Sequence, residues 1–401
     1  MSAVNSSSLT GSTALPGETM KAIVLSGVRR LELRDVPRPT ISSHEVLVRI
    51  AAVGLCGTDA HIFAGHANYN TNNLGHPIPL ELQPQILGHE ITGIIDDVGS
   101  EVHDLLIGDR VVIDQGLNCV SRRRELLCEY CRTGDSHQCE FYREHGITGL
   151  PGGLADYLAV PAVNTIKIES KLDFLSAALV EPLGCVIHSS DAVAKIRSRF
   201  SLNADNSDQR IRGVLICGAG PAGLLFTQYL RSVLGYEGSL IVTDPNDRKL
   251  AMARSFGATE AINATDFDLV ELVREHTGGK GVEYLIEASG SGVIFASIPG
   301  LIRKQATVLM YGHGHSGNDL SLLNNIFFKE PAMVAAVGAS GGFGGDGRPS
   351  IYSRALKLIE QKKISVDSLI THKYSTLADV EAALASDMQS PDYVKGVVSV
   401  C

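Results

Sequence analysis

A short apolar run that passes directly into a glycine-rich turn, and then into a helical pattern, limits this chain to few folds. The run is Val214 to Cys217, the turn is Gly218-Ala219-Gly220-Pro221-Ala222-Gly223, and the helical pattern extends from Leu224 to Val233. A strand, a turn and a helix in this order begin a β-α unit, and apolar runs alternate with helical patterns further along. The residues after Gly213 therefore predict an α/β domain with a doubly wound parallel sheet.

The glycines of this turn have the spacing of a dinucleotide fingerprint. Gly218 suits the tight turn, Gly220 lets a pyrophosphate approach the backbone, and Gly223 lets the helix pack closely on the strand. Pro221 and Ala222 lead into the helix, whose N-terminus offers free N–H groups and a partial positive charge to the phosphates. The turn therefore predicts a bound dinucleotide.

The second strand of the unit indicates which dinucleotide is bound. It runs from Leu240 to Thr243 and ends at Asp244, about 20 residues beyond the last glycine, where an acid accepts hydrogen bonds from the adenosine ribose. A carboxylate at this place repels a 2′-phosphate, whereas Arg248 nearby would attract one. We expect NAD in preference to NADP.

Two short segments earlier in the chain offer metal ligands of three kinds. Cys56 lies in the run Gly-Leu-Cys-Gly-Thr-Asp-Ala-His, and His89 and Glu90 follow Gly88 about thirty residues later. A catalytic zinc takes thiolate, imidazole and carboxylate ligands and keeps one position open. A hydroxyl at Thr58 and an imidazole at His61 would give the proton of a bound alcohol a path to solvent.

A further carboxylate competes for the same metal. Glu181 stands in the run Glu-Pro-Leu, just before the change to the α/β pattern. Neighbouring positions on a strand point to opposite faces, so His89 and Glu90 need not both bind the metal. Either Glu90 or Glu181 therefore completes the site directly, and the other supports it.

Four cysteines close together predict a second zinc site. Cys128 and Cys131 form a pair with two residues between them, and Cys139 follows after seven more. Four thiolates close the coordination sphere of zinc, so such a site stabilises a lobe and performs no chemistry. Cys119 is the expected fourth ligand, with Glu125 as the alternative and an empty lobe as the remaining possibility.

Composition excludes several other classes of protein. Acidic residues outnumber basic ones by 44 to 35, and no long block of like charges suggests nucleic acid. No apolar stretch approaches the roughly 20 residues that span a bilayer, and 1–19 lacks the features of a signal peptide. Eight cysteines in a chain of this length do not form a disulfide framework. We expect a cytoplasmic protein with a disordered tail at 1–19 and neither a nucleic-acid nor a membrane partner.

With these motifs in this order, the chain resembles the zinc-dependent medium-chain alcohol dehydrogenase/reductase family, and within it the polyol (sorbitol) dehydrogenase branch. The resemblance covers Met20 to the C-terminus, and Glu181, in place of a further zinc thiolate, points to the polyol branch. It implies a GroES-like β-rich catalytic domain with a zinc-binding lobe and a Rossmann domain. The implied boundaries are 20–186 for the first part of the catalytic domain, 187–337 for the Rossmann domain, and 338–401 for a segment that returns to the catalytic domain.

The resemblance also implies roles for the residues. Cys56 and His89 would bind the catalytic zinc, Asp59 would orient His89, and Thr58 and His61 would relay the proton. The implied activity is hydride transfer between NAD and a secondary alcohol of a polyol, sugar or cyclitol. An amino-alcohol (threonine-type) dehydrogenase and a catalytically silent NAD-binding protein are the alternatives. Relatives are dimers or tetramers, so we expect a homodimer or homotetramer.

Overall fold

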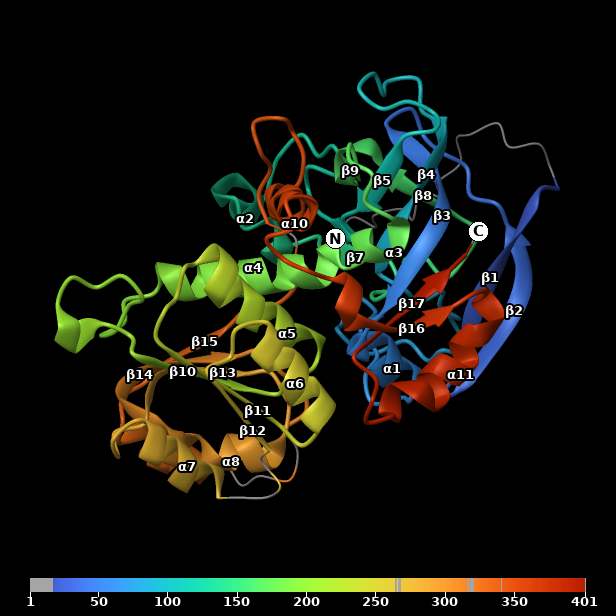
Figure 1. Ribbon diagram of the computed structural model, residues 1–401. Coiled ribbons are helices and arrows are strands. Elements are labelled where there is room, and N and C mark those ends of the chain that lie inside the picture. Colours follow the sequence, from blue (N-terminus) through green and yellow to red (C-terminus); the bar gives the residue numbers. More distant parts are fainter. Residues whose placement is uncertain are drawn as a thin grey trace.

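The computed structural model describes residues 17–263, 265, 268–315, 317, 321–339 and 341–400, and it shows a β-rich unit beside an α/β unit (Figure 1). Of the predicted tail, only residues 17–19 are described. Strand β1 begins at Thr19, the last residue of that range. No helix in the described ranges has both the length and the apolar composition needed to cross a bilayer.

The β-rich unit is built on a largely antiparallel sheet that joins both ends of the chain. Its strand order is β16-β17-β3-β4-β5-β9, and β8 also pairs with β3. The last strand, β17, lies antiparallel to β3, so the C-terminal segment completes the unit begun near the N-terminus. The strands are β3 (Glu45–Leu55), β4 (Glu90–Val98), β5 (Arg110–Ile113), β8 (Tyr157–Pro161), β9 (Thr165–Lys167), β16 (Ile370–Tyr374) and β17 (Lys395–Ser399).

Smaller elements surround this sheet. A hairpin is formed by β1 (Thr19–Gly27) and β2 (Arg30–Pro37), and a two-stranded ribbon by β6 (Gly116–Leu117) and β7 (Arg143–Glu144). The helices of this unit are α1 (Gly57–Phe63), α2 (Glu129–Thr133), α3 (Phe174–Ala177) and α11 (Val380–Ala385). The short 3-10 turns of the chain are Ser136–Gln138, Ala162–Asn164, Ser207–Gln209, Asp367–Leu369, Leu377–Asp379 and Asp387–Gln389.

The α/β unit is a parallel six-stranded sheet in the order β12-β11-β10-β13-β14-β15. The chain starts in the middle with β10, builds outward to β12, and then returns to build the other half from β13. This order confirms the predicted doubly wound Rossmann sheet, and ligands bind such sheets at the carboxyl ends where the order reverses. The strands are β10 (Gly213–Cys217), β11 (Ser239–Asp244), β12 (Glu260–Asn263), β13 (Val282–Glu287), β14 (Ile302–Met310) and β15 (Ala332–Ala335).

Helices cover both faces of the parallel sheet (Figure 1). Helices α5 (Pro221–Gln228) and α6 (Asp247–Ser255) pack on β10, β11 and β12, while α7 (Leu269–His276) and α8 (Gly292–Leu301) lie on the opposite face. A π-helical turn, Tyr229–Val233, continues α5, and α9 (Leu322–Phe327) precedes β15. Strands that are covered on both faces need apolar side chains throughout, which explains the apolar runs of the sequence.

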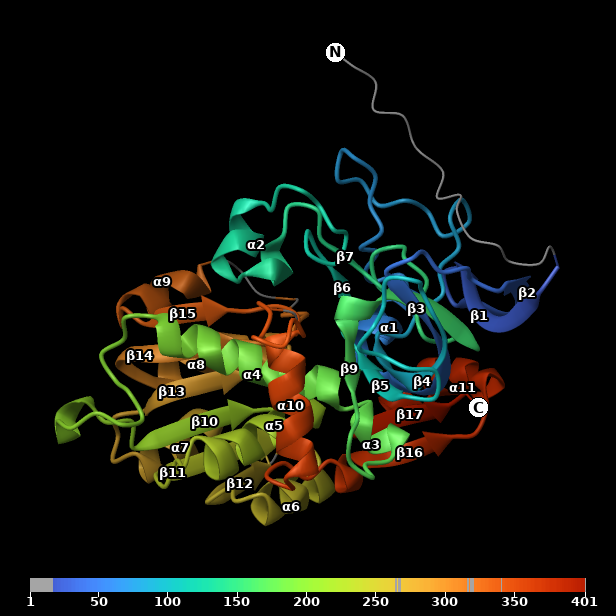
Figure 2. The same ribbon diagram turned by 90° about the horizontal axis from the view of Figure 1, so that it is seen from above.

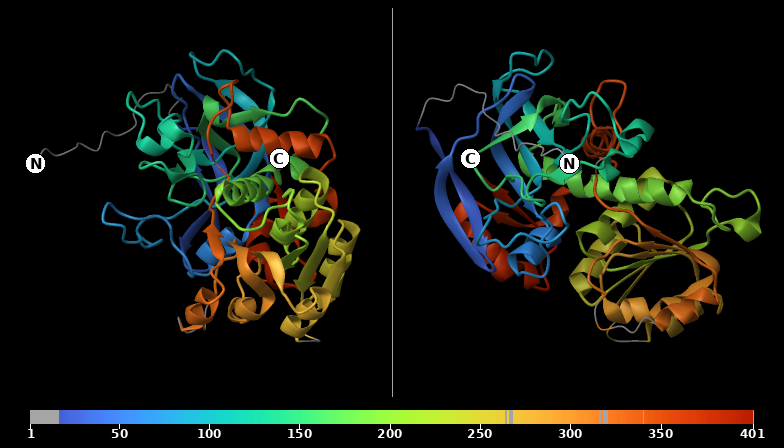
Figure 3. Two further views of the ribbon diagram at one scale, coloured as in Figure 1. Left: turned by 90° about the vertical axis from the view of Figure 1, so that its left-hand side faces the viewer. Right: turned by 180° about the vertical axis from the view of Figure 1, so that it is seen from behind.

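One long helix, α4 (Val180–Lys195), connects the two units, and α10 (Ser350–Glu360) packs across it (Figure 2, Figure 3). The main apolar core is continuous across this junction. It contains Val112 from the β-rich sheet, Leu183 from α4, Ile216 from the parallel sheet and Tyr352 from α10. This shared core fixes how the two units face each other, and Glu181 lies in the first turn of the connecting helix.

Candidate active site

Asp59 joins the two short segments that carry the predicted metal ligands. Cys56 is the N-cap of α1, and its backbone N–H donates to Asp59 Oδ2 at 2.9 Å. The N–H of Gly88 donates to Asp59 Oδ1 at 3.1 Å, and His89 Nδ1 lies 3.4 Å from that oxygen. Asp59 is completely buried. It therefore fixes the start of α1 against the segment at Gly88 and lies where it can orient the imidazole.

The structure brings Cys56, His89 and Glu90 together, with their ligand atoms within 4.8 Å of one another. Strand pairing places Gly54 opposite Glu90, and a Cβ at position 54 would lie 1.9 Å from Glu90 Oε2. That oxygen is buried and has no hydrogen-bond partner in the described part of the chain. An unpartnered buried carboxylate oxygen beside a thiol and an imidazole is the donor set that zinc satisfies, so these residues fit the metal.

Glu181 reaches the same site from the connecting helix. Its Oε1 accepts hydrogen bonds from Gln115 Nε2 at 3.2 Å and from Cys185 Sγ at 3.4 Å. Burial raises the pKa of Glu181 to about 7, and the charge of Glu90 adds to this, while His89 and Lys395 oppose it. Glu181 thus shares an electrostatic environment with the three clustered ligands, although it is not among the atoms within 4.8 Å.

Lys395 is a site residue that sequence reasoning missed. Its Nζ donates to Glu90 Oε1 at 2.5 Å and to the carbonyl of Leu55 at 2.8 Å, and the side chain is almost completely buried. The sequence gives one weak signal, a lysine inside the otherwise apolar C-terminal run. A buried ammonium needs an anionic partner, and here that partner is a predicted metal ligand.

Glu144 is a second residue that sequence reasoning missed. It lies on β7, opposite Gly116 of β6. Burial raises the pKa of Glu144, whereas the charge of His89 and hydrogen bonds from Tyr142 and Gln115 oppose that rise. Glu144 therefore adds a carboxylate to the surroundings of His89, besides Asp59, Glu90 and Glu181, and it belongs to no recognisable sequence motif.

Thr58 and His61 follow Cys56 along α1. Thr58 Oγ1 lies 3.8 Å from Cys56 Sγ, so its hydroxyl is beside the ligand cluster. His61 is exposed, and its ring lies 6.1 Å from that of His66. Partial burial lowers the pKa of His61, with contributions from His66 and from His313 of the α/β unit. His61 therefore lies between the ligand cluster and solvent, on the side that faces the nucleotide-binding unit.

The four cysteines predicted for the second metal site converge in one lobe. The sulfur atoms of Cys119, Cys128, Cys131 and Cys139 lie within 4.8 Å of one another. The separations from Cys139 Sγ are 3.6 Å to Cys119 and 3.8 Å to Cys128. Tetrahedral zinc with bonds of about 2.3 Å requires sulfur atoms about 3.8 Å apart. The set therefore fits zinc, and Glu125 is exposed, outside the sulfur cluster.

The glycine turn has the shape that a dinucleotide requires. Gly218 has a φ of 104°, and a Cβ at Gly223 would lie 1.8 Å from Gly218 O. At Gly220, the N-cap of α5, a Cβ would meet nothing within 4 Å, which leaves the space through which phosphates approach the helix. The helix begins at Pro221, followed by Ala222, three residues before the start predicted at Leu224.

Asp244 and Arg248 lie at the end of β11 and the start of α6. Asp244 Oδ2 accepts the N–H of Ala219 at 2.8 Å, so this carboxylate holds the glycine turn in place. Arg248 forms an ion pair with Asp392 of the C-terminal segment at 2.8 Å. The positive charge that would attract a 2′-phosphate is thus partly compensated.

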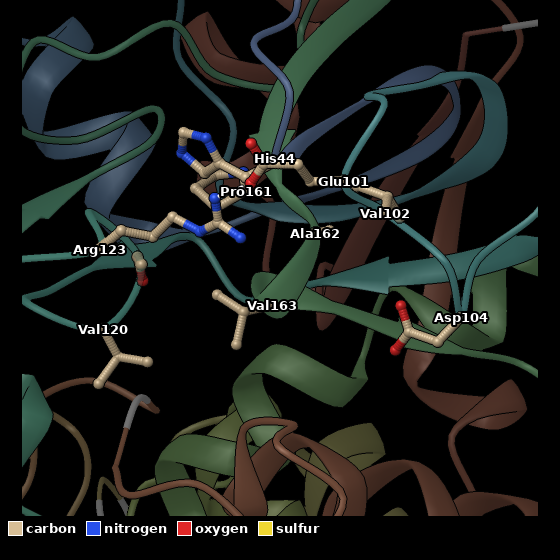
Figure 4. Close-up of a pocket in the computed structure, with 10 residues that line it drawn as sticks. His44, Glu101, Val102, Asp104, Val120, Arg123, Pro161, Ala162 and Val163 are labelled. Carbon is tan, nitrogen blue, oxygen red and sulfur yellow. Dashed lines mark hydrogen bonds and ion pairs between the residues drawn. The ribbon is translucent and has the colours of Figure 1, made fainter.

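A separate hollow of about 320 Å³ lies on the surface of the β-rich unit (Figure 4). Its lining includes His44, Glu101 and Arg123, and the last two form an ion pair. None of the predicted ligand or nucleotide residues lines it, so it is not part of the ligand cluster.

Comparison with known proteins agrees with the two units of the fold. Residues 42–170 match the alcohol dehydrogenase GroES-like domain, and residues 221–361 match the zinc-binding dehydrogenase domain. A sorbitol dehydrogenase from Halalkalibacterium halodurans is 29% identical, over 89% of this chain and 93% of that protein. An L-threonine 3-dehydrogenase from Anaeromyxobacter sp. is 30% identical, over 88% of this chain and 92% of the relative.

Solved structures show the same architecture. A zinc-binding dehydrogenase from Sinorhizobium meliloti, bound to NADP, superposes with a TM-score of 0.77 at 27% identity, over 95% of this chain and 99% of that one. The matches span both units. The chain belongs to the zinc-dependent medium-chain alcohol dehydrogenase/reductase family.

Proposed function

We propose that this enzyme transfers a hydride between NAD and a secondary alcohol of a polyol, sugar or cyclitol. The observation that carries the proposal is the buried group of Cys56, His89 and Glu90, with Glu181 entering from the helix that leads to the nucleotide-binding unit. Cys56 and His89 would hold the zinc, with Glu90 and Glu181 sharing direct and water-mediated contact. When bound, zinc acts as a Lewis acid on the substrate oxygen.

The chain's own residues then handle the proton and the orientation of the substrate. Thr58, beside Cys56, accepts the substrate's hydroxyl proton as it gives up its own, and His61 passes the released proton on to solvent. Asp59 keeps the imidazole of His89 in one orientation. The glycine turn and Asp244 hold the dinucleotide so that its nicotinamide meets the substrate in the space between the two units.

Glu144 supports a substrate that carries several hydroxyl groups. The residue is half-buried and its carboxylate interacts with His89, so this group can accept a hydrogen bond from a hydroxyl next to the reacting one. The test is NADH formation at 340 nm across polyols, sugars, cyclitols and L-threonine. We expect kcat/KM for the best polyol-type substrate to exceed that for L-threonine at least tenfold; the reverse order would establish the amino-alcohol alternative.

The proposed cofactor preference follows from two charges. The Asp244 carboxylate opposes a 2′-phosphate, and Asp392 compensates Arg248. We expect kcat/KM with NAD to exceed that with NADP at least tenfold. Equal values would contradict the preference without affecting the proposed reaction.

The silent NAD-binding alternative makes a different prediction. A protein without activity would bind NAD and zinc yet form no NADH with any substrate of the panel. Zinc content measured by atomic emission, together with NAD binding by calorimetry, separates a silent protein from one that has merely lost its metal.

We also place the enzyme in the cytoplasm as a homo-oligomer. Zinc-binding thiolates suit a reducing compartment, and the location of a fluorescent fusion tests this. Strand β15 pairs only with β14 in the described sheet, and exposed apolar side chains at Phe328, Met333 and Val337 lie on and near this edge. Light scattering after gel filtration is expected to give twice or four times the mass of one chain.

A further inference from the structure

A buried chain of hydrogen bonds runs from the C-terminal segment to the carboxylate of Glu181. Tyr352, in the first turn of α10, donates its hydroxyl to Gln115 Oε1, and Gln115 Nε2 donates to Glu181 Oε1 at 3.2 Å. The three side chains are 0%, 1% and 5% exposed, respectively. Gln115 lies between β5 and β6, so three segments distant in sequence meet at this point.

The direction of each hydrogen bond follows from the chemistry of the partners. The amide of Gln115 turns its nitrogen, which can only donate, toward Oε1 of Glu181, which accepts. Its oxygen then faces Tyr352, whose hydroxyl must donate. The Gln115 side chain also forms a hydrogen bond with Glu144. Tyr352 therefore selects one of the two orientations of the Gln115 amide.

Both donors to Glu181 bind the same carboxylate oxygen, and neither binds Oε2. Both Gln115 and Cys185 donate to Oε1. These two hydrogen bonds hold Oε1 of the carboxylate in place. Glu181 belongs to α4, and α4 packs against α10. Residues that orient metal ligands contribute to metal affinity because they remove the freedom of the ligand to turn away.

We propose that Tyr352 and Gln115 are positioning residues, which fix Glu181 so that Oε2 faces the catalytic zinc. The inference rests on the proposed function, which places Glu181 at the metal. Tyr352 acts only through Gln115, and neither residue touches the substrate. The helix α10 thus contributes to metal binding as well as to the core between the two units.

The test compares Tyr352→Phe and Gln115→Met with a matched control, Tyr236→Phe. Tyr236 is also buried, and its hydroxyl donates to the carbonyl of Ser239 at 3.0 Å, so the control loses an equivalent hydrogen bond away from Glu181. The first readout is the affinity of the catalytic site for zinc, measured by competition with a chelator in the full-length protein. The second is the visible spectrum of cobalt in that site, with zinc kept in the cysteine lobe.

We expect Tyr352→Phe and Gln115→Met to weaken zinc binding by about tenfold to a hundredfold and to change the cobalt spectrum. Tyr236→Phe is expected to do neither. Near-ultraviolet circular dichroism checks that each variant is folded, and Gln115→Met still tests the proposal if Tyr352→Phe does not fold. Zinc affinity and cobalt spectra like those of the control in both variants would overturn it.

Glu181→Gln separates failure of this proposal from failure of the proposed function. If Glu181→Gln weakens zinc binding and Tyr352→Phe adds little in that background, the chain acts through Glu181 as proposed. An equal loss from Tyr352→Phe with and without Glu181→Gln would show a general structural effect and overturn the positioning role alone. Unchanged zinc binding and turnover in Glu181→Gln would instead remove Glu181 from the metal site and overturn the positioning role, while the proposed hydride transfer would stand.

Discussion

Lys395 Nζ lies 2.5 Å from Glu90 Oε1, and both side chains are almost completely withdrawn from solvent. The two residues are 305 positions apart, and they meet because β17 pairs with β3 while β3 pairs with β4. The ammonium balances one of the carboxylates crowded around the metal site. The last strand, β17, therefore contributes a residue to a metal site whose other residues lie in the first half of the chain.

Lys395→Met should destabilise the protein strongly, because it leaves the buried Glu90 carboxylate without its partner. Breaking a buried ion pair from one side costs about 3–5 kcal/mol of unfolding free energy. Adding Glu90→Gln to Lys395→Met removes the unpaired charge and should recover part of that loss. Urea unfolding of the two variants measures the difference, and equal stabilities would show that the pair is not the cause.

Cys119→Ser should remove the structural zinc and leave the catalytic one. A closed site of four thiolates performs no chemistry, so the loss is expected in zinc content and thermal stability, with kcat changed by less than about threefold. Glu125→Gln is the matched control, since Glu125 is exposed outside the sulfur cluster. A variant at Glu125 that lost the same zinc would reverse the assignment of the fourth ligand.

Short-range motifs made much of this protein predictable. The glycine turn and the pair Cys128 and Cys131 are defined by spacing within a few residues, and local spacing determines local geometry. The parallel sheet followed from the same reasoning, because covered strands must be apolar and the pattern of runs shows where they lie. Cys119 could be assigned to the same site because the loop between Cys119 and Cys128 is long enough to bring their sulfur atoms together.

The partners of the metal ligands could not be predicted in this way. Lys395, Gln115 and Tyr352 become neighbours of the site only after the strands pair and α10 packs on α4. Contacts over such sequence separations depend on the whole tertiary structure. The residue type of a lysine or a glutamine does not indicate which residue it will contact. Glu144 was missed for the same reason, since its role depends on the ribbon of β6 and β7.

Thr58→Val should lower turnover and leave zinc binding intact. The hydroxyl lies 3.8 Å from Cys56 Sγ and is the first acceptor proposed for the substrate proton. Loss of a positioned proton-transfer group costs about 10²–10⁴-fold in rate. Thr58→Ser keeps the hydroxyl and should retain most of the activity. Steady-state kinetics with zinc content measured in parallel tests this, and equal rates for the two variants would exclude Thr58 from the relay.

His145 should make the folded state sensitive to mild acid. Burial lowers the pKa of His145, while its hydrogen bond to the carbonyl of Pro151, at 2.7 Å, opposes the effect. The folded protein therefore binds fewer protons at this side chain than the unfolded chain does. Its contribution to stability is complete above the unfolded pKa of about 6.5 and is lost as the pH falls from there toward the lower folded value.

His145→Asn isolates this contribution, because the asparagine amide can donate to Pro151 O in place of Nδ1–H but does not ionise. The variant is expected to lose less unfolding free energy than the wild type between about pH 6.5 and 5. His103→Asn serves as the control, since His103 is exposed, and it should follow the wild type. Urea unfolding at a series of pH values gives the slopes. A slope in His145→Asn as steep as in the control would show that another buried group carries the acid sensitivity.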